Sequence, residues 1–509
     1  MIFNVLQLLE KNASANSEKI ALSDGTSSVT YGMYREQARR IGSYIIKNTS
    51  QTGSCYGSRP VAVLIDRNIL SIITFMGVIY SGNFYVPVDA SMPEERIKLI
   101  YQTLDPLMVI DARGRESVME GAEDALSIIE NTETDDGLLD AVRSGHIDTD
   151  PLYCIFTSGS TGVPKGVAVS HRSVLDLTEA FHDSFGFSED LVFGNQAPFD
   201  FDVSVKDIYN ALFNNARVEV IPKKLFKLPG TLVDYIREKH INTLIWAVSA
   251  LRIVADFKTF GASAPPEEIR YIMFSGEVMP VKALNYWMDN VPGARYVNLY
   301  GPTEITCNCT YYEIKKRHED DEMLPVGKAF KNTRVFLRDD RNQIISVKDQ
   351  VGEICVSGTC LALGYWNNKE RTDAAFLPDP VISAYPSRIY ATGDMGYYNA
   401  DGDIVFASRK DYQIKHMGHR IELGEVETAL NAIPFVTVSC CIYDSINEKI
   451  VCFYQAESEC RKEIVLALSK KLPKYMWPNE YRFFNEMPMN KNGKIDRVLL
   501  KKQIGEKKR

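Results

Sequence analysis

Short apolar runs alternate with stretches of helical periodicity in the first part of the chain. The pattern predicts strands at 61–65, 84–88 and 107–110, and helices at 69–80 and 94–103 between them. Strands that alternate with helices are typical of a mostly parallel sheet with helices on both faces. We therefore expect an α/β layer at the start of the chain.

The same alternation continues further along the sequence. Strands are predicted at 217–221, 243–247, 271–274 and 296–299, and each pair is separated by a segment long enough for a helix. We expect this part to form a second α/β subdomain.

From about residue 326 the pattern changes to shorter strand-like runs separated by glycine and aspartate. Strands are predicted at 335–337 and 352–356, and Asp401-Gly402 predicts a hairpin turn. This texture is typical of a small β-rich subdomain. After it the pattern becomes a compact α+β unit with a helix at 423–432.

The predicted fold class is therefore α/β, with two domains. Residues 1–410 form a large N-terminal domain of two α/β subdomains plus the β-rich subdomain, and residues 411–509 form a small α+β domain. A chain of 509 residues is also longer than one hydrophobic core usually serves.

Composition excludes several classes of protein. The hydrophobic content of 45% and the charged content of 24% are those of an ordinary soluble protein. No apolar run approaches the roughly 20 residues of a membrane-spanning helix. The first ten residues lack a basic leader and a small-residue cleavage site. We expect a cytoplasmic protein.

Charge is distributed unevenly along the chain. Residues 412–509 hold 17 Lys and Arg against 12 Asp and Glu, whereas residues 1–411 hold 41 against 54. A basic small domain suits an acidic partner or a phosphate-bearing arm, although solubility alone also explains it. We do not expect nucleic acid as a partner, because the chain has no recognisable binding motif and a net charge of −8.

One stretch combines hydroxyls, glycines and a single lysine: Thr157-Ser158-Gly159-Ser160-Thr161-Gly162-Val163-Pro164-Lys165-Gly166. It connects predicted strands at 152–156 and 167–169. Inward backbone N–H groups, hydroxyl donors and one positive charge together suit phosphate oxygens. It is not a P-loop, because Pro164 precedes Lys165, Gly166 follows it, and no helix begins directly after it.

Four further motifs follow in order: Asn298-Leu-Tyr-Gly-Pro-Thr-Glu304, Tyr390-Ala-Thr-Gly-Asp394, Ser408-Arg409-Lys410-Asp411 and Asn490-Lys-Asn-Gly-Lys494. Together with the Ser/Gly/Thr loop they resemble the adenylate-forming superfamily, which includes acyl-CoA synthetases, luciferases and the adenylation domains of nonribosomal peptide synthesis. The resemblance covers nearly the whole chain. It implies that ATP activates a carboxylate by forming an acyl-AMP.

The resemblance also implies a role for each motif. Glu304 would hold Mg²⁺, Thr303 would donate to the α-phosphate, and Lys494 would bridge the carboxylate and the α-phosphate in the transition state. Tyr300 would stack on adenine, while Asp394 and Arg409 would contact the ribose. Singly, each residue type more often has an ordinary structural role. A glutamate after a turn is usually solvated, an aspartate after Thr-Gly usually caps a neighbouring element, and a lysine near the end of a chain is usually a surface charge. The prediction therefore rests on the ordered set of motifs. The loop residues implied to grip the β and γ phosphates are Thr157, Ser158, Gly159, Ser160, Thr161, Gly162 and Lys165.

A second reaction is implied for the small domain. In the family this domain rotates about a hinge residue, which matches Asp411, and presents a second face to a thiol acceptor. Lys415 and Gly418 would lie on that face, although an ordinary strand edge would have a similar sequence.

The substrate class is indicated by Phe201-Asp202-Val203-Ser204-Val205. Asp202 matches the aspartate with which amino-acid-activating members bind the substrate ammonium group. Enzymes for fatty or aryl acids lack a carboxylate there, which is reasonable because a buried unpaired carboxylate is costly. An amino-acid substrate is therefore predicted. The other substrate positions implied by the resemblance are Val203, Lys206, Ile245, Met273, Ser275, Leu299, Cys307 and Asn308.

Over its whole length the chain resembles the freestanding D-alanine carrier protein ligases, but it departs from them at two of the predicted substrate positions. Ser275, in Phe274-Ser-Gly-Glu-Val-Met-Pro280, stands where those enzymes have cysteine, and Lys206 could pair with an acidic side chain or extend to solvent at the rim. D-Alanine, serine and glutamate all remain open as substrates.

The predicted acceptor is a phosphopantetheine thiol on a separate carrier protein, because the chain contains no pantetheine-serine motif after Lys494. Coenzyme A is the alternative acceptor, and an acyl- or aryl-CoA ligase is the alternative enzyme. A third hypothesis is a regulatory protein that keeps the fold and binds nucleotide but catalyses no reaction. The presence of Lys494, Glu304 and Asp394 disfavours that hypothesis.

Overall fold

The computed structural model describes residues 2–49, 57–115, 117–159, 162–320, 322–410, 413–489 and 495–506. The chain divides into two compact units. Unit 1 holds residues 1–89, 104–155 and 166–410, and unit 2 holds residues 90–103, 156–165 and 411–509. Two short segments of the predicted N-terminal domain thus group with the C-terminal residues, which the sequence did not indicate.

The largest sheet of unit 1 is mixed and, within the described residues, has nine strands. Its central strands β9 to β13 run parallel, and the antiparallel strands β14 and β2 lie toward its two edges. In order across the sheet, the strands are β15 (Lys328–Ala329), β14 (Thr310–Ile314), β13 (Arg295–Tyr300), β12 (Tyr271–Ser275), β11 (Thr243–Ala247), β9 (Val192–Asn195), β10 (Arg217–Val220), β1 (Ile20–Ser23) and β2 (Ser28–Thr30).

A second sheet is mostly parallel, and its described part has seven strands. Its central strands β3 and β4 are fully or almost fully buried, which explains their nearly continuous apolar sequence. In order, the strands are β19 (Gly364–Tyr365), β8 (Lys165–Ser170), β7 (Pro151–Thr157), β4 (Phe84–Asp89), β3 (Pro60–Ile65), β5 (Met108–Asp111) and β6 (Glu123–Asp124).

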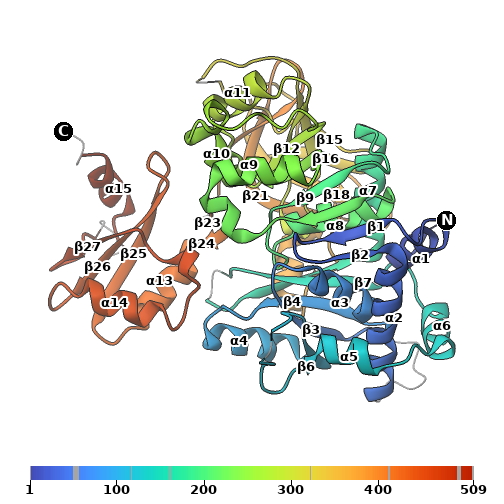
Figure 1. The fold of residues 1–509 in the computed structure, drawn as a ribbon. Helices are drawn as coiled ribbons and strands as arrows, with labels where there is room; N and C mark the ends of the chain where they lie inside the picture. Colours follow the sequence, from blue (N-terminus) through green and yellow to red (C-terminus); the bar gives the residue numbers. More distant parts are fainter. Residues whose placement is uncertain are drawn as a thin grey trace. The chain divides into compact units, whose positions relative to one another are not determined.

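The helices of unit 1 pack on these sheets: α3 lies on β3 and β4, and α2 packs against α3 (Figure 1). All twelve residues of α3 are buried, so this helix is apolar on every side. The helices are α1 (Val5–Ala15), α2 (Tyr31–Asn48), α3 (Ile69–Tyr80), α5 (Ala125–Asn131), α6 (Asp136–Ser144), α7 (His171–Phe185), α8 (Val203–Phe213), α9 (Pro229–Glu238), α10 (Val248–Asp256), α11 (Val281–Asn290) and α12 (Lys369–Ala375).

The predicted β-rich subdomain is an antiparallel sheet in unit 1. As predicted, Asp401 and Gly402 lie in the turn between β21 and β22, and Gly402 has a φ of 76°. The described strands are β17 (Ile344–Ile345), β16 (Thr333–Arg338), β18 (Gly352–Gly358), β21 (Arg388–Tyr398), β20 (Phe376–Pro378) and β22 (Ile404–Arg409).

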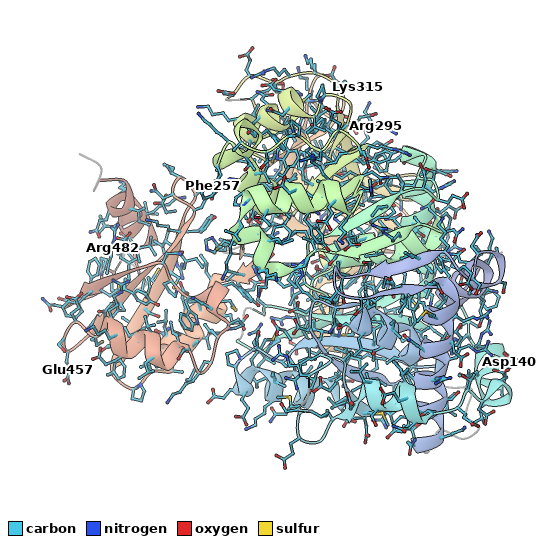
Figure 2. All side chains as sticks on the ribbon, in the orientation of Figure 1. Asp140, Phe257, Arg295, Lys315, Glu457 and Arg482 are labelled. Carbon is cyan, nitrogen blue, oxygen red and sulfur yellow. The ribbon has the colours of Figure 1, made fainter. Side chains whose placement is uncertain are left out.

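Unit 2 is an α+β unit. Its described strands form a hairpin, β23 with β24, and a sheet in the order β25, β26, β27, with α13 packed on β25. Arg482 on β27, labelled in Figure 2, lies over the Phe453 ring with its guanidinium carbon 5.5 Å from the ring centroid. The elements are α4 (Glu94–Leu104), β23 (Gln413–His416), β24 (His419–Glu422), α13 (Leu423–Asn431), β25 (Val436–Asp444), β26 (Lys449–Ala456), α14 (Arg461–Leu468), β27 (Glu480–Phe484) and α15 (Arg497–Glu506).

The predicted fold class is confirmed, and the predicted strands and helices agree with the structure to within a few residues at each end. The strands and helices could be located because long apolar runs lie between turn residues in the sequence. Among the described helices, none is long and apolar enough to cross a membrane.

Candidate functional site

Parallel register brings several predicted site residues to one edge of the largest sheet. Ala247 and Ser275 end β11 and β12 side by side, and β13 ends at Tyr300 next to them. The carboxyl ends of parallel strands are where open α/β sheets bind ligands. The loop 301–309, which follows β13, therefore lies at a binding edge.

This loop is tightly folded and strained. A Cβ added at Gly301 would lie 2.7 Å from both the Cys307 carbonyl oxygen and the Asn308 Cα, so only glycine fits. Thr306 and Cys307 have φ values of 58° and 71°, which side chains with a Cβ rarely adopt. The Thr306 hydroxyl donates to the Cys360 carbonyl at 2.8 Å and helps to hold this conformation. Such strain is typical of functional loops.

The three residues predicted to contact adenosine form one buried network. The Tyr300 hydroxyl donates to Asp394 Oδ2 at 2.6 Å, and the Arg409 guanidinium pairs with Asp394 Oδ1. Asp394 and Arg409 lie directly opposite each other on β21 and β22. Burial, reinforced by the Asp394 charge, raises the pKa of Tyr300 well above its usual value, so its hydroxyl remains a donor.

Glu304 lies on a short 3₁₀ turn, residues Thr303–Ile305, and is fully buried. The Tyr365 hydroxyl donates to Glu304 Oε1 at 2.8 Å. Mg²⁺ in nucleotide sites is commonly held by one or two carboxylates together with phosphate oxygens, and a single oriented carboxylate fits that requirement. Within the described ranges, no cluster of three or more His, Cys, Asp or Glu residues could hold a metal. Glu304 is therefore the candidate Mg²⁺ ligand.

Asp202 is the N-cap residue of α8, and its side chain makes no capping hydrogen bond. Its backbone carbonyl accepts a hydrogen bond from the Cys307 thiol at 3.0 Å. Burial, with a smaller effect from the Asp202 charge, raises the pKa of Cys307 well above its usual value, so the thiol stays protonated. This contact joins the helix that carries Asp202 to the loop that carries Thr303 and Glu304.

Lys206, one turn along α8, does not extend to solvent. Its side chain is 1% exposed, and Nζ donates to Ser275 Oγ at 2.9 Å. The two positions at which the sequence departs from D-alanine carrier protein ligases thus contact each other. Three other predicted substrate positions are buried and apolar: Ile245, Met273 and Leu299. Lys206 adds a charge to this set of positions, and Ser275 adds a hydroxyl.

Asn308 is buried, with 2% exposure, and neither its carboxamide nitrogen nor its oxygen has a hydrogen-bond partner within the described residues. An unsatisfied buried amide is costly, and it calls for an explanation in a folded protein. Val203, the remaining predicted substrate position, is half-buried at the start of α8.

The predicted phosphate loop belongs to unit 2. Gly162 has a φ of 83°, as its glycine permits, and Lys165 is buried at the start of β8. The Thr157 hydroxyl is buried at the end of β7 without a partner in the described part of the chain. Ser158 and Gly159 are bound by residues after position 411, as described below.

Lys415 lies on β23, and Gly418, with a φ of 81°, lies in the turn between β23 and β24. The structure does not test their predicted role on a thiol-facing surface. Ser160, Thr161, Asp411 and Lys494 lie outside the described residues.

Sequence reasoning missed two residues that contact predicted site residues, and a third residue that contacts one of these two. Tyr365 binds Glu304, Glu425 binds the Gly159 amide, and Arg96 binds Glu425. None lies in a quoted motif, and a charged residue on a predicted amphipathic helix normally indicates an exposed face. Arg96 and Glu425 differ from ordinary exposed charges on a helix because the fold buries both side chains.

Comparison with known proteins identifies the family. The family model "AMP-binding enzyme" matches residues 9–366, and "AMP-binding enzyme C-terminal domain" matches residues 425–494. Tyrocidine synthase 1 from Brevibacillus parabrevis is 30% identical over 98% of this chain, and bacitracin synthase 1 from Bacillus licheniformis is 30% identical over 97%. The chain spans only 45% and 9% of these two proteins.

A relative of similar length is the D-alanine--D-alanyl carrier protein ligase of Bacillus licheniformis, which is 29% identical over 98% of this chain and 99% of its own length. Two solved structures share the fold. An adenylation and PCP protein bound to a vinylsulfonamide inhibitor has a TM-score of 0.84 at 23% identity, covering 98% of this chain and 84% of its own. The Vibrio cholerae adenylation domain AlmE, with glycyl-adenosine-5'-phosphate, has a TM-score of 0.83 at 19% identity, covering 99% and 98%.

The resemblance inferred from the five ordered motifs is thereby confirmed at the level of the family. Both family models fall on the units that carry these motifs, and the first spans the loop, the Tyr300 strand and Glu304. This chain belongs to the AMP-binding enzyme family.

Proposed function

We propose that this enzyme is a ligase that activates an amino acid with ATP and then forms a thioester. The substrate carboxylate attacks the α-phosphate of ATP, which gives an aminoacyl-AMP and releases pyrophosphate. The phosphopantetheine thiol of a separate carrier protein then attacks the acyl carbon, and AMP leaves. The D-alanine--D-alanyl carrier protein ligase, which matches nearly end to end, supports this assignment.

The proposal rests mainly on two hydrogen bonds that hold the end of β13 and the loop that follows it. At its start, Tyr300 binds Asp394, which we assign to the ribose; near its end, Cys307 binds the Asp202 backbone, which we assign to the substrate. One loop thus connects the residue assigned to the nucleotide with the residue assigned to the substrate. A reaction between two bound molecules can gain a large part of its rate from such fixed relative positions.

The amino-acid assignment rests on Asp202, whose carboxylate would hold the substrate ammonium group. Lys206, Ser275 and Asn308 further favour a polar amino acid over alanine, because a charge, a hydroxyl and an unsatisfied amide lie among the predicted substrate positions. A polar side chain could satisfy the Asn308 amide, whereas a methyl group could not.

The remaining assignments follow the family motifs. Glu304 would hold Mg²⁺, which would neutralise phosphate charge when bound. Lys494 would stabilise the negative charge that develops between the carboxylate and the α-phosphate. We also propose that residues 411–509 move about Asp411 between the two reactions, and that Lys415 and Gly418 then face the thiol.

Acid-dependent exchange of labelled pyrophosphate into ATP tests this function. The panel holds the proteinogenic L-amino acids, D-amino acids including D-alanine, and several fatty and aryl acids. Exchange with one amino acid, and its loss in Asp202→Ala, is expected. Exchange only with acids that lack an amine would contradict the amino-acid assignment and favour the alternative acyl- or aryl-CoA ligase, and no exchange with any acid would contradict the proposal.

A further inference from the structure

One backbone amide of the predicted phosphate loop donates its hydrogen bond to a carboxylate of the protein itself. Within unit 2, the Gly159 N–H donates to Glu425 Oε2 at 3.0 Å, and the Arg96 guanidinium forms an ion pair with Glu425 Oε1. Arg96 is 4% exposed and Glu425 1%. A guanidinium from α4 and a loop amide thus converge on one buried anion, which is provided by α13.

Neighbouring contacts hold the loop in the same place. The Ser158 hydroxyl donates to the Arg420 carbonyl at 2.8 Å and accepts from the Glu422 N–H at 3.2 Å. Gly162 approaches α13 so closely that an added Cβ would lie 3.2 Å from Thr428 Cγ2. Residues on either side of Gly159 therefore also contact the β24–α13 segment.

We infer that Arg96 and the Gly159 amide form an anion site that Glu425 and the polyphosphate of ATP occupy in turn. The inference rests on the proposed function, which assigns this loop to the β and γ phosphates. Carboxylate and phosphate oxygens accept the same charge-assisted hydrogen bonds from a guanidinium fork and a backbone amide. Gly159 has one N–H, so the two anions compete for it.

Because the ion pair is buried, departure of Glu425 and binding of the ATP phosphates should occur together. Removing one partner of a buried ion pair leaves an uncompensated charge, which is strongly unfavourable. When Glu425 leaves, the ATP phosphates take its place beside Arg96. In this scheme Arg96 is a phosphate ligand for the adenylation step, and Glu425 lowers the apparent affinity for ATP by holding the site closed.

Equilibrium binding of Mg²⁺-ATP and of AMP to the full chain, without amino acid, tests the inference. Glu425→Gln keeps the shape of the side chain but removes its charge, so the Kd for ATP should fall by about threefold or more. The Kd for AMP, which lacks the β and γ phosphates, should stay within about twofold. Arg96→Gln should raise the Kd for ATP by about tenfold and leave that for AMP unchanged.

Glu427→Gln is the matched control. Glu427 lies on the same helix, but its carboxylate binds Arg497 Nη2 at 2.7 Å and the Cys441 amide at 2.6 Å. This variant should bind ATP like the wild type.

An unchanged or weaker ATP affinity in Glu425→Gln would overturn the inference, as would an equal change for ATP and AMP. Normal ATP affinity in Arg96→Gln would also overturn it, and if that variant does not fold, Glu425→Gln decides alone. Failure of the wild type to bind ATP would instead contradict the proposed function itself.

Discussion

At the scale of single residues, the contacts of the predicted site residues depend on how distant parts of the chain pair in the fold. Asp394, Arg409 and Tyr300 can be named from motifs, yet the contacts that Asp394 makes with the other two join residues up to 94 positions apart and depend on strand pairing. Lys206 was equally compatible with a solvent-exposed position. Its burial against Ser275 follows from the packing of α8 on β11, the strand next to β12, which no local pattern reveals.

Lys206 should select the substrate side chain. Lys206→Met keeps the length and removes the charge, so exchange with the preferred polar amino acid should fall at least about tenfold in kcat/KM, while apolar amino acids lose less. Ser275→Ala, which removes only the hydroxyl, should have a smaller effect. An unchanged order of preference across the amino-acid panel would show that Lys206 does not face the substrate.

Asp394 should act on the nucleotide rather than on the amino acid. Asp394→Asn removes the partner charge of Arg409, and the KM for ATP should rise about tenfold or more while the amino-acid KM changes little. Tyr300→Phe removes one hydrogen bond to the same carboxylate and is the milder comparison. Equal rises in both KM values would indicate a general structural defect instead.

At the scale of elements, apolar runs between turn residues were sufficient to locate most helices and strands. The helix at 69–80 was predicted to the residue because its whole length is buried and apolar. The grouping of α4 with unit 2 could not be predicted. It depends on Arg96 and Glu425, which are separated by 329 positions in the sequence.

The junction of β8 and α7 should make stability depend on pH. Burial lowers the pKa of His171 to about 3, and its Nδ1 accepts a hydrogen bond from the Val5 amide of α1 at 3.4 Å. The unfolded chain binds this proton near pH 6.5, whereas the folded chain does not. Stability from the neutral ring is therefore complete above pH 6.5 and is lost as the pH falls toward 3.

Thermal melts at pH 7 and pH 5 test this effect. His171 should account for about 2 kcal/mol of the wild-type loss between these values, and His171→Gln should reduce the loss by that amount. His240→Gln, at an exposed histidine, is the control and should behave like the wild type. An identical pH dependence in His171→Gln and wild type would exclude His171 as the cause.

At the scale of the whole molecule, the two proposed reactions would use residues from both ends of the chain. Composition and the change in texture predicted a large domain followed by a small one. The two-reaction scheme itself rests on the family motifs, and its residues Lys494 and Asp411 lie outside the described part of the structure. The domain boundary after residue 410 and the hinge therefore stay predictions.

Lys494 should serve only the first reaction. Lys494→Ala should lower pyrophosphate exchange at least about 100-fold, because it removes charge stabilisation at the α-phosphate. Thioester formation from a synthetic aminoacyl-AMP and a carrier protein with a free phosphopantetheine thiol should remain within a few-fold of wild type. Lys491→Ala, in the same motif, should retain both activities. A full loss of thioester formation in Lys494→Ala would contradict the division of roles.

The most direct test of the central claim follows an oxygen atom. The preferred amino acid, labelled with ¹⁸O in its carboxylate, is incubated with ATP, the enzyme and a thiol acceptor, and the products are analysed by mass spectrometry. Attack of the carboxylate on the α-phosphate predicts one ¹⁸O atom in each AMP released. Label in inorganic phosphate, or AMP without label, would show that the enzyme does not activate its substrate as an acyl-AMP.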